Sequence, residues 1–398
     1  MACAVSSLRE PAAMKHSGGG EEIVIVGGGL AGASAACVLA QAGRPALLIE
    51  RETAPRHKVC GEFLSIEAQT YLSRLGISLD DLGASRIASV RLIHGRTTAE
   101  ADLPFMARGL SRKILDEVLL DRAVASGVRL VRGPAVRRMS ANDSGIRADA
   151  GELGEIHART LFLATGKHDV RGVKRPPAGA AEDLIGFKAH YILNARQQRS
   201  LEGTVEIYLF AGGYAGLQMI EGAVANLCLV ATRRCFEQAG RTWRNLLDHV
   251  GRETPLLEDR LEGAMPVFER PLSIFQIPYG FIHSPHPAEP QGLFRLGDQA
   301  GVIPSFTGDG MAIALHSGCF AASTYLTAGQ ASSDFHRRLR ADISDQVRLA
   351  SLFHRVSRRP VGRQAILGLC RAWPRVMSHV TALTRIRSSA VQGSPAWS

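Results

Sequence analysis

The chain has 398 residues, 45% of them hydrophobic, and a formal net charge of +10. This composition excludes a chain that is disordered throughout and allows two or three domains with sizeable cores. Seven cysteines without a C-x-x-C pair argue against a disulfide framework or a zinc site and favour reduced thiols in a cytoplasmic compartment. Because no stretch reaches roughly 18 apolar residues, no helix is expected to span a bilayer.

In chain order, a flexible leader over residues 1–20 is expected to precede a nucleotide-binding βαβ unit. Residues 22–27 and 46–50 are predicted to form buried strands, because both are short apolar runs. Between them, residues 30–42 are predicted to form a helix whose small side chains allow close packing on the sheet. The short connections are those of a βαβ unit.

Three glycines, Gly27, Gly29 and Gly32, form a G-x-G-x-x-G sequence directly after the first strand. The first permits a tight turn, the second lets the backbone approach a pyrophosphate at the helix N-terminus, and the third allows helix and strand to pack closely. Glu50 follows Gly29 by 21 residues (50 − 29) and ends the second strand, where an acid binds a ribose hydroxyl. Arg51 beside it leaves open a cofactor with a 2′-phosphate. The pattern predicts a dinucleotide site.

The chain then alternates between helical and strand-like segments. Residues 65–75 are predicted to form a helix capped by Ser65, and residues 87–104 to form antiparallel strands of another layer. Residues 111–126 are predicted to form an amphipathic helix. Arg112 at its start either faces a phosphate or ring edge or points into solvent.

A second cofactor-binding segment lies 265 residues after the first (297 − 32). An apolar run ends on Gly297-Asp298, whose carboxylate can accept a bond from a sugar hydroxyl. In the turn that follows, Gly308 and Gly310 present bare N–H groups at the start of a helix. Asp309 in this turn is either functional or merely the N-cap of that helix. Two such segments predict a long cofactor held at both ends, which favours FAD over NAD.

These elements predict an α/β fold in which a Rossmann-like FAD-binding domain is built from discontinuous segments. A mainly antiparallel β-sheet substrate domain is inserted between them, and the C-terminal region is helical. The predicted boundaries are residues 21–80, 106–172 and 290–330 for the FAD-binding domain, 81–105 and 173–289 for the substrate domain, and 331–398 for the C-terminal region.

Four motifs together resemble the FAD-dependent oxidoreductase superfamily that contains aromatic-ring hydroxylases, geranylgeranyl reductases and flavin halogenases. They are the glycine fingerprint, Ser111-Arg112-x-x-Leu115-Asp116, Leu163-Ala-Thr-Gly166, and the Gly-Asp pair with Pro304-x-x-x-Gly308-x-Gly310. The resemblance covers roughly residues 21–325. It implies that Arg112 faces FAD, that Asp298 binds the ribityl chain and that the turn over residues 304–310 lies beside the isoalloxazine ring. It also implies a β-sheet substrate domain over the flavin face.

Within this superfamily, Lys58-Val-Cys-Gly61-Glu-Phe-Leu-Ser65 is similar to the geranylgeranyl-reductase branch, where a Cys-Gly pair lies near the flavin. Cys60 is therefore a candidate flavin-side thiol, although a buried cysteine also serves as a small apolar residue. Tyr208, Phe210 and Gly213 fall where those reductases carry an aromatic Y-x-W-x-F-P substrate motif. Here Phe210 replaces the tryptophan and the F-P pair is missing.

The resulting expectation is an FAD-dependent oxidoreductase that acts on a small lipophilic or aromatic substrate, with NAD(P)H as electron donor. A monooxygenase that hydroxylates a bulky apolar, aromatic or quinone-like substrate is favoured, because the prenyl-contact motif is degraded. A reductase that saturates prenyl double bonds is the alternative. His57, His190, His283 and His316 are acid–base candidates only by residue type.

The C-terminal region holds nearly all of the excess charge. Residues 331–398 contain twelve arginines, no lysine and three acids. This is either a solvated helical face or a site for an acidic partner, and the apolar residues interleaved over 337–387 favour contact with the inner face of an anionic membrane. A third hypothesis is therefore a flavin-binding, membrane-docked regulatory protein. Sparse aromatic residues argue against nucleic-acid binding.

Overall fold

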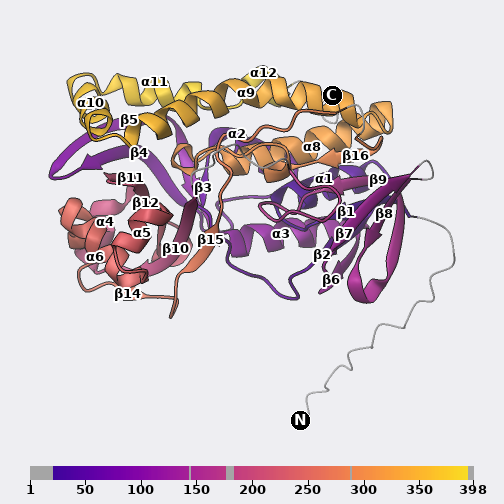
Figure 1. Ribbon diagram of the computed structural model, residues 1–398, viewed down its shortest axis with the longest axis horizontal. Coiled ribbons are helices and arrows are strands. Elements are labelled where there is room, and N and C mark those ends of the chain that lie inside the picture. Colours follow the sequence, from indigo (N-terminus) through magenta and orange to yellow (C-terminus); the bar gives the residue numbers. More distant parts are fainter. Residues whose placement is uncertain (1–20, 143–144, 176–182, 287–288, 393–398) are drawn as a thin grey trace, which may run out of the picture.

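The computed structural model describes residues 21–142, 145–175, 183–286 and 289–392. Two β-sheets lie side by side, and a layer of C-terminal helices runs across both of them (Figure 1). The predicted α/β class, inserted sheet and helical C-terminal region are confirmed. The leader predicted over residues 1–20 lies outside the described residues.

The first sheet has the strand order β6-β2-β1-β9-β8-β7, with β16 paired to β9. Its strands are β1 (Glu21–Val26), β2 (Leu47–Glu50), β6 (Arg129–Arg132), β7 (Arg138–Asn142), β8 (Gly145–Asp149), β9 (Glu155–Leu163) and β16 (Leu293–Arg295), with the short turn η1 (Gly151–Leu153) before β9. The pairs β6-β2, β2-β1, β1-β9 and β9-β16 are parallel. Ile25 packs under helices and Val24 into a second core on the other face, which explains the uninterrupted apolar run of β1.

Helices pack on one face of this sheet: α1 (Leu30–Gln41), α2 (Ile66–Arg74), α3 (Arg112–Ala125) and α8 (Gly310–Ala328). The predicted helices over 30–42 and 111–126 are confirmed to within one residue at each end. α1 and α8 approach closely, because a Cβ at Gly318 of α8 would collide with the carbonyl oxygen of Ala31. The small side chains of α1 serve this contact as well as the contact with the sheet.

The second sheet has the strand order β14-β10-β13-β12-β11-β4-β5-β3, with β15 also paired to β10. Its strands are β3 (Phe63–Leu64), β4 (Ser85–His94), β5 (Thr97–Gly109), β10 (Leu184–Ile192), β11 (Gly203–Phe210), β12 (Gly213–Met219), β13 (Ala225–Thr232), β14 (Met265–Pro266) and β15 (Leu272–Phe275). Helices α4 (Ala195–Leu201), α5 (Arg233–Gln238), α6 (Trp243–Glu253) and α7 (Pro255–Leu261) and the turn η2 (Glu221–Ala223) belong to this domain. The pairing is antiparallel except between β4 and β11.

The C-terminal region forms α9 (Ser332–Ser357), α10 (Pro360–Ala372), α11 (Arg375–Leu383) and α12 (Ser388–Gln392). α9 packs on α8, whereas α10 and α11 pack on β4 and β5 at the far end of the second sheet (Figure 1). Among the described helices, none is long and apolar enough to cross a membrane.

Two helical glycines are expected to respond in opposite ways to alanine. Gly318→Ala should lower the free energy of unfolding by about 1–3 kcal/mol, because its Cβ meets the backbone of α1. Gly368→Ala in α10 should raise it by about 0.5–1 kcal/mol, because nothing lies within 4 Å of the added carbon and alanine favours the helix. Urea denaturation of both variants checks this, and equal effects at the two sites would contradict the close packing of α1 on α8.

Candidate active site

A cleft of about 840 Å³ opens between the two sheets, at the carboxyl ends of β1 and β2. Its walls come from the loops that follow β1, β2 and β9 and from strands β10 and β13. The turn over residues 304–310 and the segments on either side of it complete the wall. The residues predicted from sequence that line it are Gly27, Gly29, Glu50, Arg51, Cys60, Arg112, Gly297, Asp298, Gly308 and Gly310. Gly32 lies outside the lining and packs against the backbone of Gly27.

The N-terminus of α1 forms one end of the cleft. Gly27 has a left-handed φ of 104°, and a side chain there would collide with the carbonyl of Ala164. The N-cap position of α1 is Gly29, so no side chain covers the first amides of the helix. Such an end attracts anions, because the exposed N–H groups and the helix dipole both favour negative charge.

Two cations stand beside Gly29. Arg112 Nη2 and Lys58 Nζ lie 3.4 Å and 3.7 Å from the position that a Cβ of Gly29 would take. Arg112 donates to both oxygens of Asp116 at 2.7 and 2.9 Å, and Lys58 pairs with the same carboxylate at 2.8 Å. Burial raises the pKa of Asp116, but the charges of Arg112 and Lys58 outweigh it and hold that pKa below its ordinary value. Asp116 thus holds both cations next to the phosphate-binding loop, although sequence reasoning singled out only Arg112.

Glu50 is fixed by backbone amides at the edge of the same end. Its Oε2 accepts a bond from Gly28 N at 2.6 Å, and its Oε1 accepts one from Glu52 N at 2.9 Å. This places the carboxylate where a ribose hydroxyl would bind. Arg51 instead contacts Glu52 and His168, so a 2′-phosphate would have to compete with these partners.

The other end of the cleft is formed by two short turns, η3 (Gly297–Gln299) and η4 (Ser305–Thr307), and by the start of α8. Asp298 pairs with Lys167 at 2.9 Å, a partner that sequence reasoning missed. Gly308 has a left-handed φ of 72°, and a Cβ there would collide with the ring of Phe63. α8 then begins at Gly310, so a second helix N-terminus faces the cleft.

Asp309 occupies the N-cap position of α8 without capping it. Its Oδ1 instead accepts bonds from Ser65 Oγ at 3.2 Å and from Arg385 Nη1 at 3.1 Å. The sequence predicted that Ser65 caps α2 with its side chain. This prediction is wrong, because no such bond forms and the hydroxyl donates to Asp309 instead. Arg385 lies between α11 and α12, and it also donates to Thr307 O at 2.5 Å. The C-terminal region thereby holds the turn over residues 304–310 in place.

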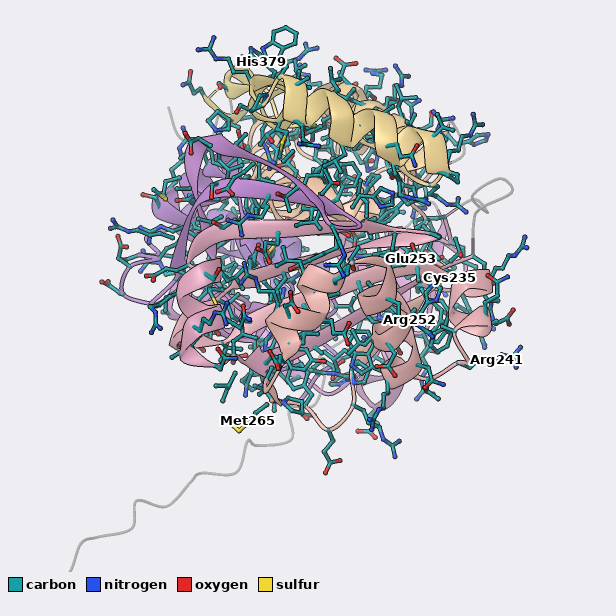
Figure 2. All side chains as sticks on the ribbon, turned by 90° about the vertical axis from the view of Figure 1, so that its left-hand side faces the viewer. Cys235, Arg241, Arg252, Glu253, Met265 and His379 are labelled. Carbon is teal, nitrogen blue, oxygen red and sulfur yellow. The ribbon has the colours of Figure 1, made fainter. Side chains whose placement is uncertain are left out.

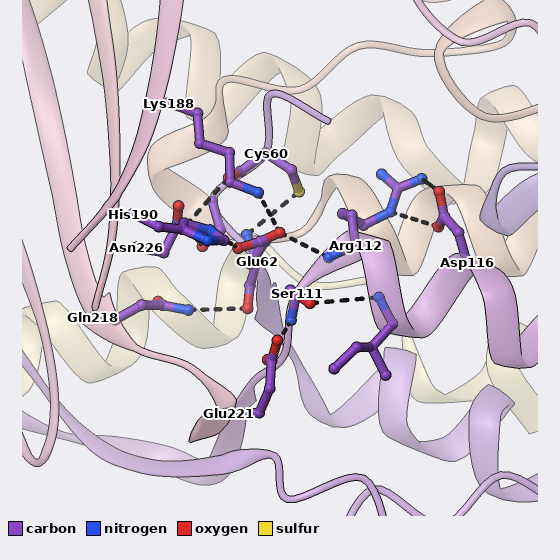
Figure 3. A network of polar contacts seen from close by, with 12 residues as sticks. Cys60, Glu62, Ser111, Arg112, Asp116, Lys188, His190, Gln218, Glu221 and Asn226 are labelled. Carbon is purple, nitrogen blue, oxygen red and sulfur yellow. Dashed lines mark hydrogen bonds and ion pairs between the residues drawn. The ribbon is translucent and has the colours of Figure 1, made fainter. Parts of the chain in front are cut away.

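In the wall of the cleft, residues 60–62 are held to the second sheet by a buried ion cluster (Figure 3). Glu62 is fully buried and has a left-handed φ of 57°, which is uncommon for a residue other than glycine. Its carboxylate accepts bonds from Lys188 Nζ, from His190 Nε2 at 2.9 Å and from the backbone N of Arg112 at 2.7 Å. Burial alone would raise the pKa of Glu62, but the bond from His190 and the charge of Lys188 lower it.

The backbone of the same segment is held by two amide side chains of the second sheet (Figure 3). Gln218 Nε2 donates to Glu62 O at 3.0 Å, and Asn226 Nδ2 donates to Gly61 O at 2.8 Å and to Cys60 O at 3.2 Å. Sequence reasoning missed Glu62 and Lys188 as a pair. The available signal was a lysine and a histidine two residues apart in an otherwise apolar strand, which places both on one face of β10.

The comparisons with known proteins agree with this geometry. Residues 21–166 match a family model described as an FAD binding domain. The fold is similar to the flavin-dependent brominase Bmp2 (TM-score 0.74, 18% identity, covering 94% of this chain and 96% of that one). It is also similar to a geranylgeranyl bacteriochlorophyll reductase-like protein from Thermoplasma acidophilum (TM-score 0.65, 17% identity, covering 95% of this chain and 96% of that one). A third similar structure is a flavoprotein/dehydrogenase from Cytophaga hutchinsonii (TM-score 0.71, 15% identity, covering 94% of this chain and 98% of that one). A search of curated protein sequences found no match.

The family match and the geometry of the cleft together support an FAD-binding domain over residues 21–166. The cleft fits the cofactor on its own chemistry, because it combines a glycine cradle, two cations and an oriented carboxylate at one end with a second helix N-terminus at the other. FAD would be held by the α1 N-terminus, Arg112 and Lys58 at its phosphates, and by Glu50 at a ribose. The fold is that of flavin-dependent enzymes, as the sequence resemblance implied.

The predicted substrate contacts lie elsewhere. Tyr208 and Phe210 are buried in the core formed with α4–α7, and the Tyr208 hydroxyl donates to Glu206. A Cβ at Gly213 would collide with the carbonyl of Val230, and none of the three lines the cleft. The reason is the two-residue period of β11, which turns Tyr208 and Phe210 away from the face that carries Leu209. A motif position by itself does not say which face of a strand its side chains occupy.

The cations beside Gly29 give a direct test of cofactor binding. The double variant Arg112→Met/Asp116→Asn removes the cation and, at the same time, the buried negative charge that pairs with it. It should weaken FAD binding by about 10- to 100-fold. The comparison variant Asp116→Asn keeps both cations and an acceptor oxygen for them, and should bind FAD more tightly than the double variant. Flavin fluorescence titration measures both. Equal affinities for the comparison variant and the double variant would contradict a phosphate contact by Arg112.

The pH dependence of the free energy of unfolding tests the environment of Asp309. Burial raises its pKa from 3.8 to about 7, although Arg385 partly offsets this. An acid whose pKa is raised by folding binds its proton more tightly in the folded state, so this group destabilises the fold as pH rises from about 4 to about 7. Asp309→Asn should therefore raise the free energy of unfolding above pH 7 by up to about 4 kcal/mol, since one pKa unit corresponds to about 1.36 kcal/mol.

Urea denaturation of the flavin-bound protein across this pH window measures the effect. The exposed Asp248→Asn serves as the control and should leave the pH dependence unchanged. Parallel pH curves for the parent and for Asp309→Asn would show that Asp309 does not titrate in this window.

Proposed function

We propose that the chain is an FAD-dependent monooxygenase that hydroxylates a compact aromatic or quinone-like substrate, with NAD(P)H as electron donor. The observation that carries the proposal is the end of the cleft along β10. Its walls are apolar, formed by Val59, Ile274 and Ile277 around Gly186, where a Cβ would come within 2.9–3.4 Å of all three side chains. A flat ring fits such walls better than a charged or strongly polar substrate.

A histidine is among the polar residues that line the cleft close in sequence to Val59. His57 lines the cleft, and its Nδ1 is buried without a hydrogen-bond partner among the described residues. Its ring lies against His190 and Phe268, with centroids 4.9 Å away in both cases. Burial and then the nearby charge of Lys188 lower the pKa of His57 to about 4, so the imidazole is neutral at neutral pH. We infer that it accepts a hydrogen bond from a phenolic hydroxyl of the substrate and orients the ring.

The size of the substrate follows from what fills the rest of the sheet. Val230 of β13 lines the cleft, but its neighbours on the same face, Tyr214 and Leu209, pack in a core with Leu367 of α10 and Met377 of α11. The C-terminal helices thus cover this face of the second sheet next to Val230. This packing supports a compact substrate over an extended prenyl chain. Reduction of a prenyl chain is the second candidate function, because Cys60 lines the cleft.

When bound, FAD supplies the two-electron redox chemistry and the reaction with molecular oxygen. The overall reaction balances as substrate–H + O₂ + NAD(P)H + H⁺ → substrate–OH + H₂O + NAD(P)⁺. The residues of this chain orient the substrate through His57 and exclude water through the apolar walls. The ion cluster at Glu62 acts as a positioning group, because it fixes residues 60–62 in the wall of the cleft.

The test is turnover of the purified flavoprotein with a panel of phenols, quinones and prenyl lipids. With isotopically labelled oxygen and NAD(P)H, the product should gain one labelled oxygen atom. Saturation of a prenyl double bond under anaerobic conditions would overturn the proposal in favour of a reductase. A product that gains a halogen only when halide is added would overturn it in favour of a halogenase.

The role of His57 is checked in the same assay. His57→Phe should lower kcat/KM by about 100-fold with FAD affinity unchanged, because it removes the polar contact and keeps the ring. His57→Asn retains an acceptor and should recover part of the activity. His249→Phe on α6 is the matched control and should behave as the parent. A similar loss for His57→Phe and His249→Phe would rule out a substrate contact by His57.

A further inference from the structure

The C-terminal helices expose apolar side chains among arginines at one end of the molecule. The exposed apolar residues are Leu352 and Val356 of α9, Val361 and Leu369 of α10, and Trp373 directly after α10. The exposed arginines beside them in the chain are Arg355, Arg359, Arg371 and Arg375. We call these nine residues the basic corner. Trp373 is 58% exposed and Val361 76%, values that are high for side chains of this kind.

The charge of this part of the chain has one sign. Residues 346–392 contain nine arginines and no aspartate, glutamate or lysine. Arg363 and Arg385 are buried, so the interpretation of the whole segment as a solvated face holds only in part. None of the four arginines of the basic corner has an ion pair within the part of the chain that the structure describes. Their charges are therefore available to an external anion.

The packing of α10 explains why these side chains face outward. A Cβ at Gly362 would collide with the carbonyl of Val356, so α9 turns tightly into α10. Leu367 and Cys370 point inward to the core of the second sheet, which leaves Val361 and Leu369 on the outer side. Seen from this end, the C-terminal helices lie at the top near His379, and Met265 and Arg241 lie on the opposite part of the molecule (Figure 2).

We propose that the basic corner binds the surface of an anionic lipid bilayer. Arginines attract the lipid headgroups, and the exposed aliphatic and indole side chains gain free energy by leaving water in the headgroup region. A nucleic-acid backbone would use the arginines but not Val361 or Leu369. A second copy of this chain would bring charges of the same sign together. An anionic bilayer can bind both the arginines and the apolar side chains of the basic corner.

The experiment is sedimentation of the flavin-bound full chain with vesicles of equal parts phosphatidylglycerol and phosphatidylcholine. The protein should sediment with these vesicles, release them as salt is raised, and stay in solution with vesicles of phosphatidylcholine alone. Arg371→Gln/Arg375→Gln should lower the partition coefficient roughly 30-fold, since each basic side chain near an anionic surface contributes about fivefold. Arg241→Gln/Arg252→Gln on the opposite part of the molecule is the matched control and should bind as the parent.

A second pair of variants tests the apolar part. Trp373→Ala should reduce binding to the anionic vesicles, whereas Met265→Ala, equally exposed at 60%, should not. Failure to sediment with anionic vesicles at low salt would overturn the proposal, as would equal losses for the corner and control variants. Tighter binding to a single-stranded oligonucleotide than to the vesicles, insensitive to Trp373→Ala, would overturn it in favour of a nucleic-acid surface.

Discussion

The interaction on which the cleft depends is the ion pair between Glu62 and Lys188. Both side chains are fully excluded from solvent, so each charge loses its hydration on folding. The cost is offset by the additional donors, His190 Nε2 and the backbone N of Arg112, which together satisfy the carboxylate. These donors come from two different parts of the fold, β10 of the second sheet and the start of α3 on the first. Glu62 therefore links the two sheets and fixes residues 60–62 between them.

The C-terminal region acts on the cleft from the other side. Arg385 places a buried guanidinium against Asp309 and Thr307, over the rings of Phe105 and Phe63. Leu367 and Met377 close the face of the second sheet beyond Tyr214. The same helices present the basic corner on their outer side. One segment thus holds the turn over residues 304–310, covers part of the second sheet and carries the corner for which we propose an anionic bilayer as partner.

Much of the cofactor site follows from local sequence, because a phosphate-binding turn is built from consecutive residues. Gly27, Gly29 and Glu50 act through backbone geometry and strand ends, which periodicity and spacing reveal. The rest depends on contacts between distant segments. Asp309 could be placed at the start of α8, but not its bond to Arg385, 76 residues away in the chain. Likewise, Tyr208 and Phe210 could be placed on a strand, yet the face they occupy is decided by the register of the whole sheet.

We propose that FAD spans the cleft, with its phosphates at the start of α1 and its ring system between the turn at 304–310 and residues 60–62. A crystal structure of the flavin-bound protein measures this directly. We expect the pyrophosphate within hydrogen-bond distance of the Gly29 backbone and the ring against Gly308 and Cys60. A ring system turned away from residues 60–62, or phosphates beyond reach of Arg112 and Lys58, would contradict it.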